Sequence, residues 1–141
     1  MHPPIDVTGL PLAADRRPEV ALADRSNRVM WLNDERVFYA GLLGTMSERT
    51  MGGWHLYVAV GEPIRISVNG AAWQSTDLAV VPPYMPHRVD CDERLVADLV
   101  IEPETVDPAA LPAFVRQGCG AVHDEPGVVR RMRELHAWLC W

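Results

Sequence analysis

Between residues 28 and 102, short apolar segments alternate with clusters of turn-forming residues. Residues 64–68 (Ile-Arg-Ile-Ser-Val) alternate apolar and polar positions, the pattern of a half-buried strand. Asn69-Gly70 follows at once and is a strong signal for a tight hairpin turn. Pro82-Pro83 ends a later segment, because proline does not continue a central strand. Many short strands at this spacing predict a mainly β sandwich or barrel.

The two ends of the chain differ from this pattern. Residues 1–27 are rich in Pro, Asp, Arg and Ala without periodicity, which predicts a flexible arm. Residues 103–141 predict a proline-rich connection and a C-terminal helix, all part of the same domain as the strands. An apolar stripe follows one face of that helix, and its members are Val128, Met132, Leu135 and Leu139. We expect the stripe to join two subunits in a homodimer, and the alternative is that it packs on the barrel.

Composition narrows the class of protein. The chain has 141 residues, a formal net charge of −6 and 13 basic residues, all of them arginine. A surface of this charge predicts no direct contact with nucleic acid. No segment predicts a membrane span or a signal peptide, so a cytoplasmic location is expected. The three cysteines lack the spacing of a zinc site and, being odd in number, do not predict a disulfide framework.

Two segments carry a family resemblance. Residues 58–70, which contain Gly61, and residues 78–87, which end in His87, resemble the core of a cupin barrel. More narrowly, they resemble the N-terminal sensor domain of AraC-type transcriptional regulators, and residues 31–32, 36–41 and 102–104 also fit that pattern. The resemblance implies a cupin-like barrel that binds a small effector, a homodimer, and a DNA-binding helix-turn-helix part that is absent from this chain. The chain ends within a helix without a stop signal, which is typical of a cut through a longer protein; the alternative is a natural terminus packed by Trp141.

Many cupins hold a metal through two histidines and a glutamate in the first motif and a histidine in the second. Counted from Gly61, the family's carboxylate position is Trp54, its first two histidines fall near Glu48 and Thr50, and only His87 keeps a ligand type. If Trp54 points inward, strand alternation turns His55 outward, away from His87. The sequence therefore predicts no metal, no other cofactor and no catalytic residue, and we expect a protein that is not an enzyme.

The alignment of Trp54 with the family's carboxylate position also predicts where a ligand would bind. An indole at position 54 in place of a carboxylate favours an aromatic or largely apolar effector near Trp54 and His87. Leu56, Trp31 and Tyr39 are weaker candidates, since apolar and aromatic residues on strands commonly only pack. His87 could equally be structural, bonded to the backbone. The alternative functions are a small metal-dependent cupin enzyme, a dioxygenase or isomerase, and a stand-alone cupin binding module.

Overall fold

The computed structural model describes residues 21–23, 29–32, 36–42, 47–92 and 95–139, with side chains for residues 47–92 and 95–138. Its strands are β1 (Ala21–Ala23), β2 (Val29–Leu32), β3 (Arg36–Leu42), β4 (Trp54–Ala59), β5 (Ile64–Val68), β6 (Gln74–Thr76), β7 (Leu78–Val81), β8 (His87–Asp90), β9 (Leu95–Ile101) and β10 (Gly120–Ala121). Its helices are the short η1 (Pro103–Thr105) and η2 (Pro108–Ala110), then α1 (Ala113–Gln117) and α2 (Pro126–Leu139). None of these helices is long and apolar enough to cross a membrane.

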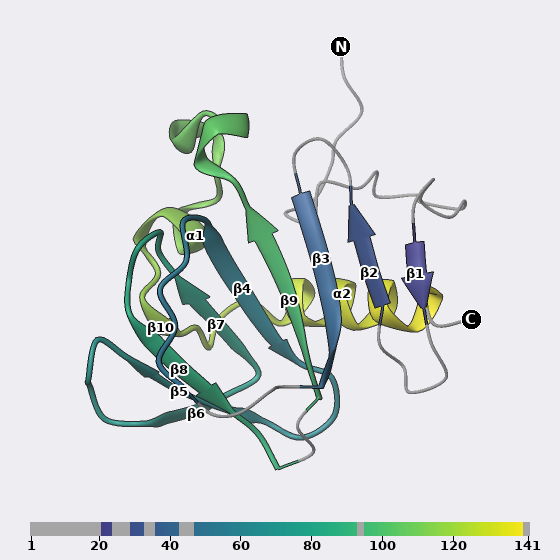
Figure 1. Ribbon diagram of the computed structural model, residues 1–141, viewed down its shortest axis with the longest axis horizontal. Coiled ribbons are helices and arrows are strands. Elements are labelled where there is room, and N and C mark those ends of the chain that lie inside the picture. Colours follow the sequence, from purple (N-terminus) through teal and green to yellow (C-terminus); the bar gives the residue numbers. More distant parts are fainter. Residues whose placement is uncertain (1–20, 24–28, 33–35, 43–46, 93–94, 140–141) are drawn as a thin grey trace.

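The described strands form two antiparallel sheets (Figure 1). The larger has the order β1-β2-β3-β9-β4-β7-β10, and the smaller has the order β6-β5-β8. Strand β9 comes after β8 in the sequence, but in the sheet it lies between β3 and β4 and pairs with both. This mainly β architecture with helices at the C-terminal end confirms the predicted fold class. Of the predicted arm, Ala21–Ala23 forms the edge strand β1, and residues 1–20 and 24–27 lie outside the described residues.

The turn signals act where the sequence places them. Asn69 and Gly70 both have positive φ, 51° and 75°, as a two-residue hairpin turn between β5 and the following segment requires. The amide of Ala71 donates to the carbonyl of Val68 across this turn, at 3.0 Å. Strand β7 ends directly before Pro82, as predicted. The turn at Asn69-Gly70 thus reverses the chain between β5 and β6. In the resulting register, Ile64 of the alternating segment pairs with Thr76.

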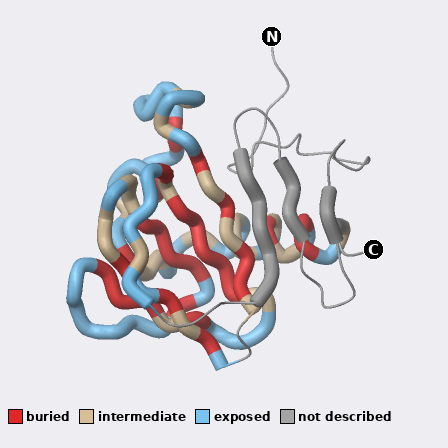
Figure 2. Tube along the Cα trace, in the orientation of Figure 1, coloured by how far each residue is buried: buried red, intermediate tan, exposed pale blue. Residues whose placement is uncertain are grey.

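The large sheet is buried along most of strands β4, β7 and β9, as the red segments of Figure 2 show. Its inner face and the small sheet enclose the inner core, which comprises Tyr57, Ala59, Ile64, Ile66, Val68, Ala79, Val81, Val89, Cys91 and Val96. Its outer face and the C-terminal helices enclose the outer core, which comprises Leu56, Val58, Leu78, Val80, Ala97, Leu99, Ile101, Leu111, Val115, Met132 and Leu135. Strand β4 contributes to both cores, so its alternate residues face two different environments.

Helix α2 uses its apolar stripe to cover its own sheet. Met132 and Leu135 are buried in the outer core, and Val128 packs against it. The side chain of Leu139 lies outside the described residues. The dimer interface predicted on this stripe is therefore wrong for Met132 and Leu135, because burial within the subunit removes both from contact with a partner. The alternative fate of an amphipathic helix, packing on the barrel, is the one observed.

Candidate functional site

Strand β4 turns its polar side chains inward. His55 and Tyr57 are 2% and 1% exposed, and Tyr57 belongs to the inner core. Leu56 belongs to the outer core, and Trp54 packs against that same core. The predicted orientation of this strand is therefore wrong by one residue. Trp54 and Leu56, the proposed pocket residues, lie on the face that the helices cover.

A carboxylate from the neighbouring strand holds His55. Asp98 of β9 lies opposite Tyr57 in the β4–β9 register. Its two oxygens are 2.9 and 2.8 Å from Nδ1 of His55. Because a carboxylate only accepts hydrogen bonds, Nδ1–H of His55 donates to Asp98. The other ring nitrogen, Nε2, is buried and has no hydrogen-bond partner among the described residues.

A second histidine is bonded at both ring nitrogens. His87 donates from Nδ1 to the backbone carbonyl of Met85, at 2.9 Å. A carbonyl only accepts, so in the neutral ring Nε2 is an acceptor, and it receives the hydroxyl of Tyr57 at 2.8 Å. The positive charge of the nearby Arg49 guanidinium acts on the same hydroxyl. The structural role considered for His87, a bond to the backbone, is thus observed, and its contact with a ligand stays a prediction.

These residues form one group, which we call the interior polar cluster: Arg49, His55, Tyr57, His87 and Asp98. The rings of His55 and Tyr57 are stacked with centroids 5.4 Å apart. The rings of His55 and His87 are 6.0 Å apart, and those of Tyr57 and His87 are 5.5 Å apart. The expectation that the two histidines lie on opposite faces is therefore wrong.

Burial keeps two members of the cluster uncharged. It lowers the pKa of His87, with His55 and Arg49 acting in the same direction, while the Met85 carbonyl and Asp98 oppose the shift. Burial also raises the pKa of Tyr57, and the charge of Asp98 adds to that shift while Arg49 opposes it. Tyr57 consequently remains a hydroxyl donor, and His87 remains a neutral acceptor, near pH 7.

The metal that many cupins hold does not fit this cluster. No group of three or more His, Cys, Asp or Glu side chains in the described part of the chain is placed to hold a metal ion. Asp98 is engaged by His55, and Nε2 of His87 by Tyr57. Only Nε2 of His55 offers an open ligand position in the cluster, and one ligand does not make a site.

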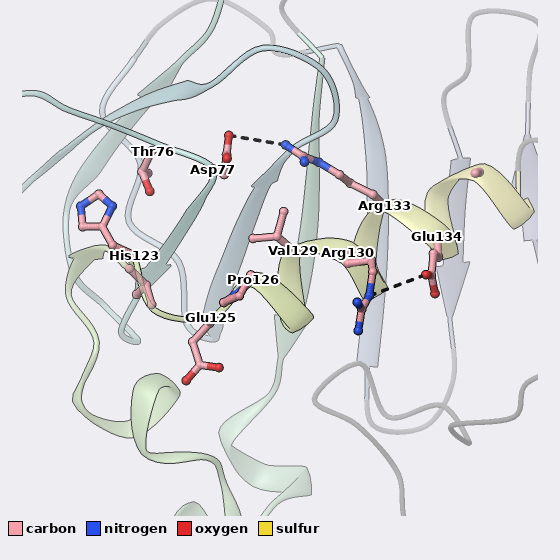
Figure 3. Close-up of a pocket in the computed structure, with 11 residues that line it drawn as sticks. Thr76, Asp77, His123, Glu125, Pro126, Val129, Arg130, Arg133 and Glu134 are labelled. Carbon is pink, nitrogen blue, oxygen red and sulfur yellow. Dashed lines mark ion pairs between the residues drawn. The ribbon is translucent and has the colours of Figure 1, made fainter.

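Two of the hollows on the described surface are relevant to ligand binding. The first, of about 540 Å³, lies between the Thr76–Asp77 turn and α2 (Figure 3). Arg133 spans it, 3.4 Å from Asp77, and also donates to the carbonyl of Ala59 at 2.7 Å. The second, of about 370 Å³, lies beside the Asn69-Gly70 turn, and its lining includes Ser67, Trp73, His87 and Arg88. The second hollow thus borders the interior polar cluster at His87.

The remaining predicted site residues lie on strands whose side chains are not described. Tyr39 of β3 is the register partner of Asp98, and Trp31 of β2 is the partner of Phe38. Their roles in binding stay predictions. The sequence-based prediction did not include Asp98, Arg49 or Tyr57, and it turned His55 away from His87. The one signal for His55 and Tyr57 was their spacing, which places two polar rings on the same face of a strand. No comparable signal pointed to Asp98 or Arg49.

Comparison with known proteins finds no family and only distant similarity to solved structures. No protein-family description matches the chain, and no curated protein does. Among solved structures, protein NMB1881 from Neisseria meningitidis is 16% identical, with 64% of this chain and 92% of that chain covered at a TM-score of 0.45. An RmlC-like cupin from Shewanella frigidimarina is 18% identical, with 60% and 86% covered at a TM-score of 0.42. The mainly β fold itself rests on the strand order described above.

The prediction that the chain is not an enzyme does not stand. Similar structures include the enzyme apo-HppE (12% identity, 61% of this chain and 56% of that chain, TM-score 0.41). They also include a Ralstonia eutropha protein assigned as a mannose-6-phosphate isomerase (15%, 64% and 94%, TM-score 0.36). The prediction further assumed that the polar side chains of β4 point away from His87, and the interior polar cluster contradicts that premise.

Proposed function

We propose that this chain is the ligand-sensing domain of an AraC-type transcriptional regulator and binds a small molecule at the interior polar cluster. One observation carries the proposal: Nε2 of His55 is buried without a hydrogen-bond partner among the described residues, while Asp98 fixes the ring through Nδ1. An unsatisfied buried polar atom costs about 1–3 kcal/mol. A bound ligand that bonds to this atom removes that cost.

The surroundings of the cluster favour a ligand that is mostly apolar. Ile66, Val81 and Val89 share the inner core with Tyr57. Binding sites of this kind combine an apolar lining with a few placed polar groups. The family resemblance adds a homodimer and a DNA-binding part outside this chain to the proposal. The cytoplasmic location expected from the sequence is also part of it. Because Met132 and Leu135 are buried within the subunit, a dimer would use another surface.

Histidine NMR provides the test. Small aromatic and aliphatic fragments that raise the melting temperature would be titrated into the protein while the imidazole ¹⁵N signals are followed. We expect His55 and His87 to shift. His123 is exposed and lines the hollow of Figure 3, so it serves as the control within the same sample. Fragments that move His123 and leave His55 and His87 unchanged would locate binding in that hollow and overturn the proposal.

A second function, proton transfer, is favoured by the same pair of residues. A histidine held through Nδ1 by a carboxylate, with Nε2 open, has the arrangement of a general base. Incorporation of solvent deuterium at the α-carbons of small hydroxyketones would reveal this activity. We expect His55→Gln to abolish the exchange and Asp98→Asn to lower it strongly. Exchange that both variants retain at the wild-type rate would exclude His55 as the base.

A further inference from the structure

We infer that the ligand of the interior polar cluster carries a hydroxyl or N–H group on an aromatic body and donates it to Nε2 of His55. This inference rests on the proposed function and specifies the chemistry of its ligand. Its basis is the pattern of donors and acceptors in the cluster, where Nε2 of His55 has no partner among the described residues.

The carboxylate of Asp98 determines the tautomer of His55. Both oxygens lie within 2.9 Å of Nδ1, so the proton of the neutral ring resides on Nδ1. Nε2 then carries a lone pair and accepts a hydrogen bond. In this tautomer the open atom is an acceptor, so a ligand that satisfies it donates a hydrogen bond.

The other hydrogen-bonding atoms of the two neighbouring rings are occupied. The Tyr57 hydroxyl donates to Nε2 of His87, and Nδ1 of His87 donates to the Met85 carbonyl. An acceptor-only ligand would place its lone pair against that of His55 Nε2, and the nitrogen would stay unsatisfied. A donor on the ligand satisfies it without breaking either bond.

The shape of the surrounding groups favours an aromatic body for the ligand. The His55 ring is stacked on Tyr57, and their planes differ by 17°. Apart from Tyr57 and Cys91, the buried residues of the inner core have aliphatic side chains. A flat apolar ligand can pack among such groups with its single donor directed at Nε2. A weakly acidic aromatic hydroxyl or a heteroaromatic N–H meets both requirements.

Two probes of nearly equal shape test the inference. 4-Methylphenol has a hydroxyl donor, and 4-methylanisole has an ether oxygen that only accepts. We expect the wild-type protein to bind the phenol about tenfold more tightly, the value of one well-placed hydrogen bond. The ¹⁵N resonance of His55 Nε2 should move with the phenol and much less with the anisole. Isothermal titration gives the affinities, and NMR identifies the atom.

A variant sharpens the test. Asp98→Asn can donate its amide to Nδ1 and move the ring proton to Nε2, as the same change does to a carboxylate-bound histidine. The preference for the phenol should then fall to less than threefold. Asp92→Asn makes the same chemical change at an exposed carboxylate bonded to Arg65, outside the cluster, and should leave the preference intact.

The outcomes separate this inference from the proposed function. Equal affinity for both probes, with His55 shifts from both, would overturn the donor requirement and leave the interior site standing. Shifts confined to His123, or no shift at His55 from either probe, would overturn the interior site and the inference with it. A preference that survives unchanged in a folded Asp98→Asn protein would refute the tautomer argument.

Discussion

Replacing Leu135 with alanine distinguishes the two possible roles of the α2 stripe. Leu135 is 1% exposed and belongs to the outer core, so its truncation leaves a space that the surrounding strands fill only in part. Such leucine-to-alanine changes lower the free energy of unfolding by about 2–5 kcal/mol. Since domains have total stabilities of about 5–15 kcal/mol, we expect a large shift of the urea unfolding curve toward lower denaturant.

Tryptophan fluorescence during urea unfolding measures this loss, and sedimentation at the same protein concentration reports the oligomeric state. Arg130→Ala is the matched control, because Arg130 is on the same helix and its side chain is 78% exposed. The control should change stability by no more than about 0.5 kcal/mol. A Leu135→Ala protein of wild-type stability that had lost self-association would show that the stripe is an interface and that the packing argument is mistaken.

Three further predictions concern the cluster and the backbone. Tyr57→Phe leaves Nε2 of His87 without its donor and should lower the unfolding free energy by about 1–3 kcal/mol; wild-type stability would contradict the hydrogen bond. Because burial lowers the pKa of His87 in the folded state, the unfolded chain binds the proton first, so stability should fall as the pH drops below about 6.5. His87→Gln should flatten that part of the stability–pH curve, and an unchanged slope would assign the effect to another group. Gly118→Ala places a Cβ against the Phe114 carbonyl and 2.9 Å from Cβ of Val80, and should cost about 1–3 kcal/mol. Gly127→Ala, with open space around the new methyl group, should be neutral or stabilising by up to about 1 kcal/mol, and equal losses at both glycines would rule out the steric argument.

Local signals in the sequence predicted much of the fold. Alternation over residues 64–68, the turn at Asn69-Gly70 and the stop at Pro82 each act over a few residues, and the structure has all three. The strand order did not follow from such signals. Strand β9 inserts between β3 and β4, and no local pattern encodes which distant strand completes a sheet. The fate of the α2 stripe was undecided for the same reason, because an apolar face does not specify its partner.

The candidate site was misplaced for a different reason, which lies in β4. Five of its six residues are buried, because the inner core covers one face and the helices cover the other. A strand buried on both faces has no exposed side to reveal its orientation. Its orientation was instead set by counting from Gly61, and since side chains alternate with a period of two, an offset of one residue exchanged every side chain between the faces.

The need of buried polar groups for hydrogen-bond partners, rather than the period of side-chain alternation, determines which way β4 faces. Both faces of β4 are closed to water, so His55 and Tyr57 need buried partners wherever they point. The outer core provides aliphatic groups, whereas the inner side holds Asp98 and His87. Yet Asp98 is 43 residues from His55 in sequence, and only the pairing of β4 with β9 brings the two together. The polar partners that determine the orientation of β4 are therefore a product of the same long-range topology that the sequence leaves open.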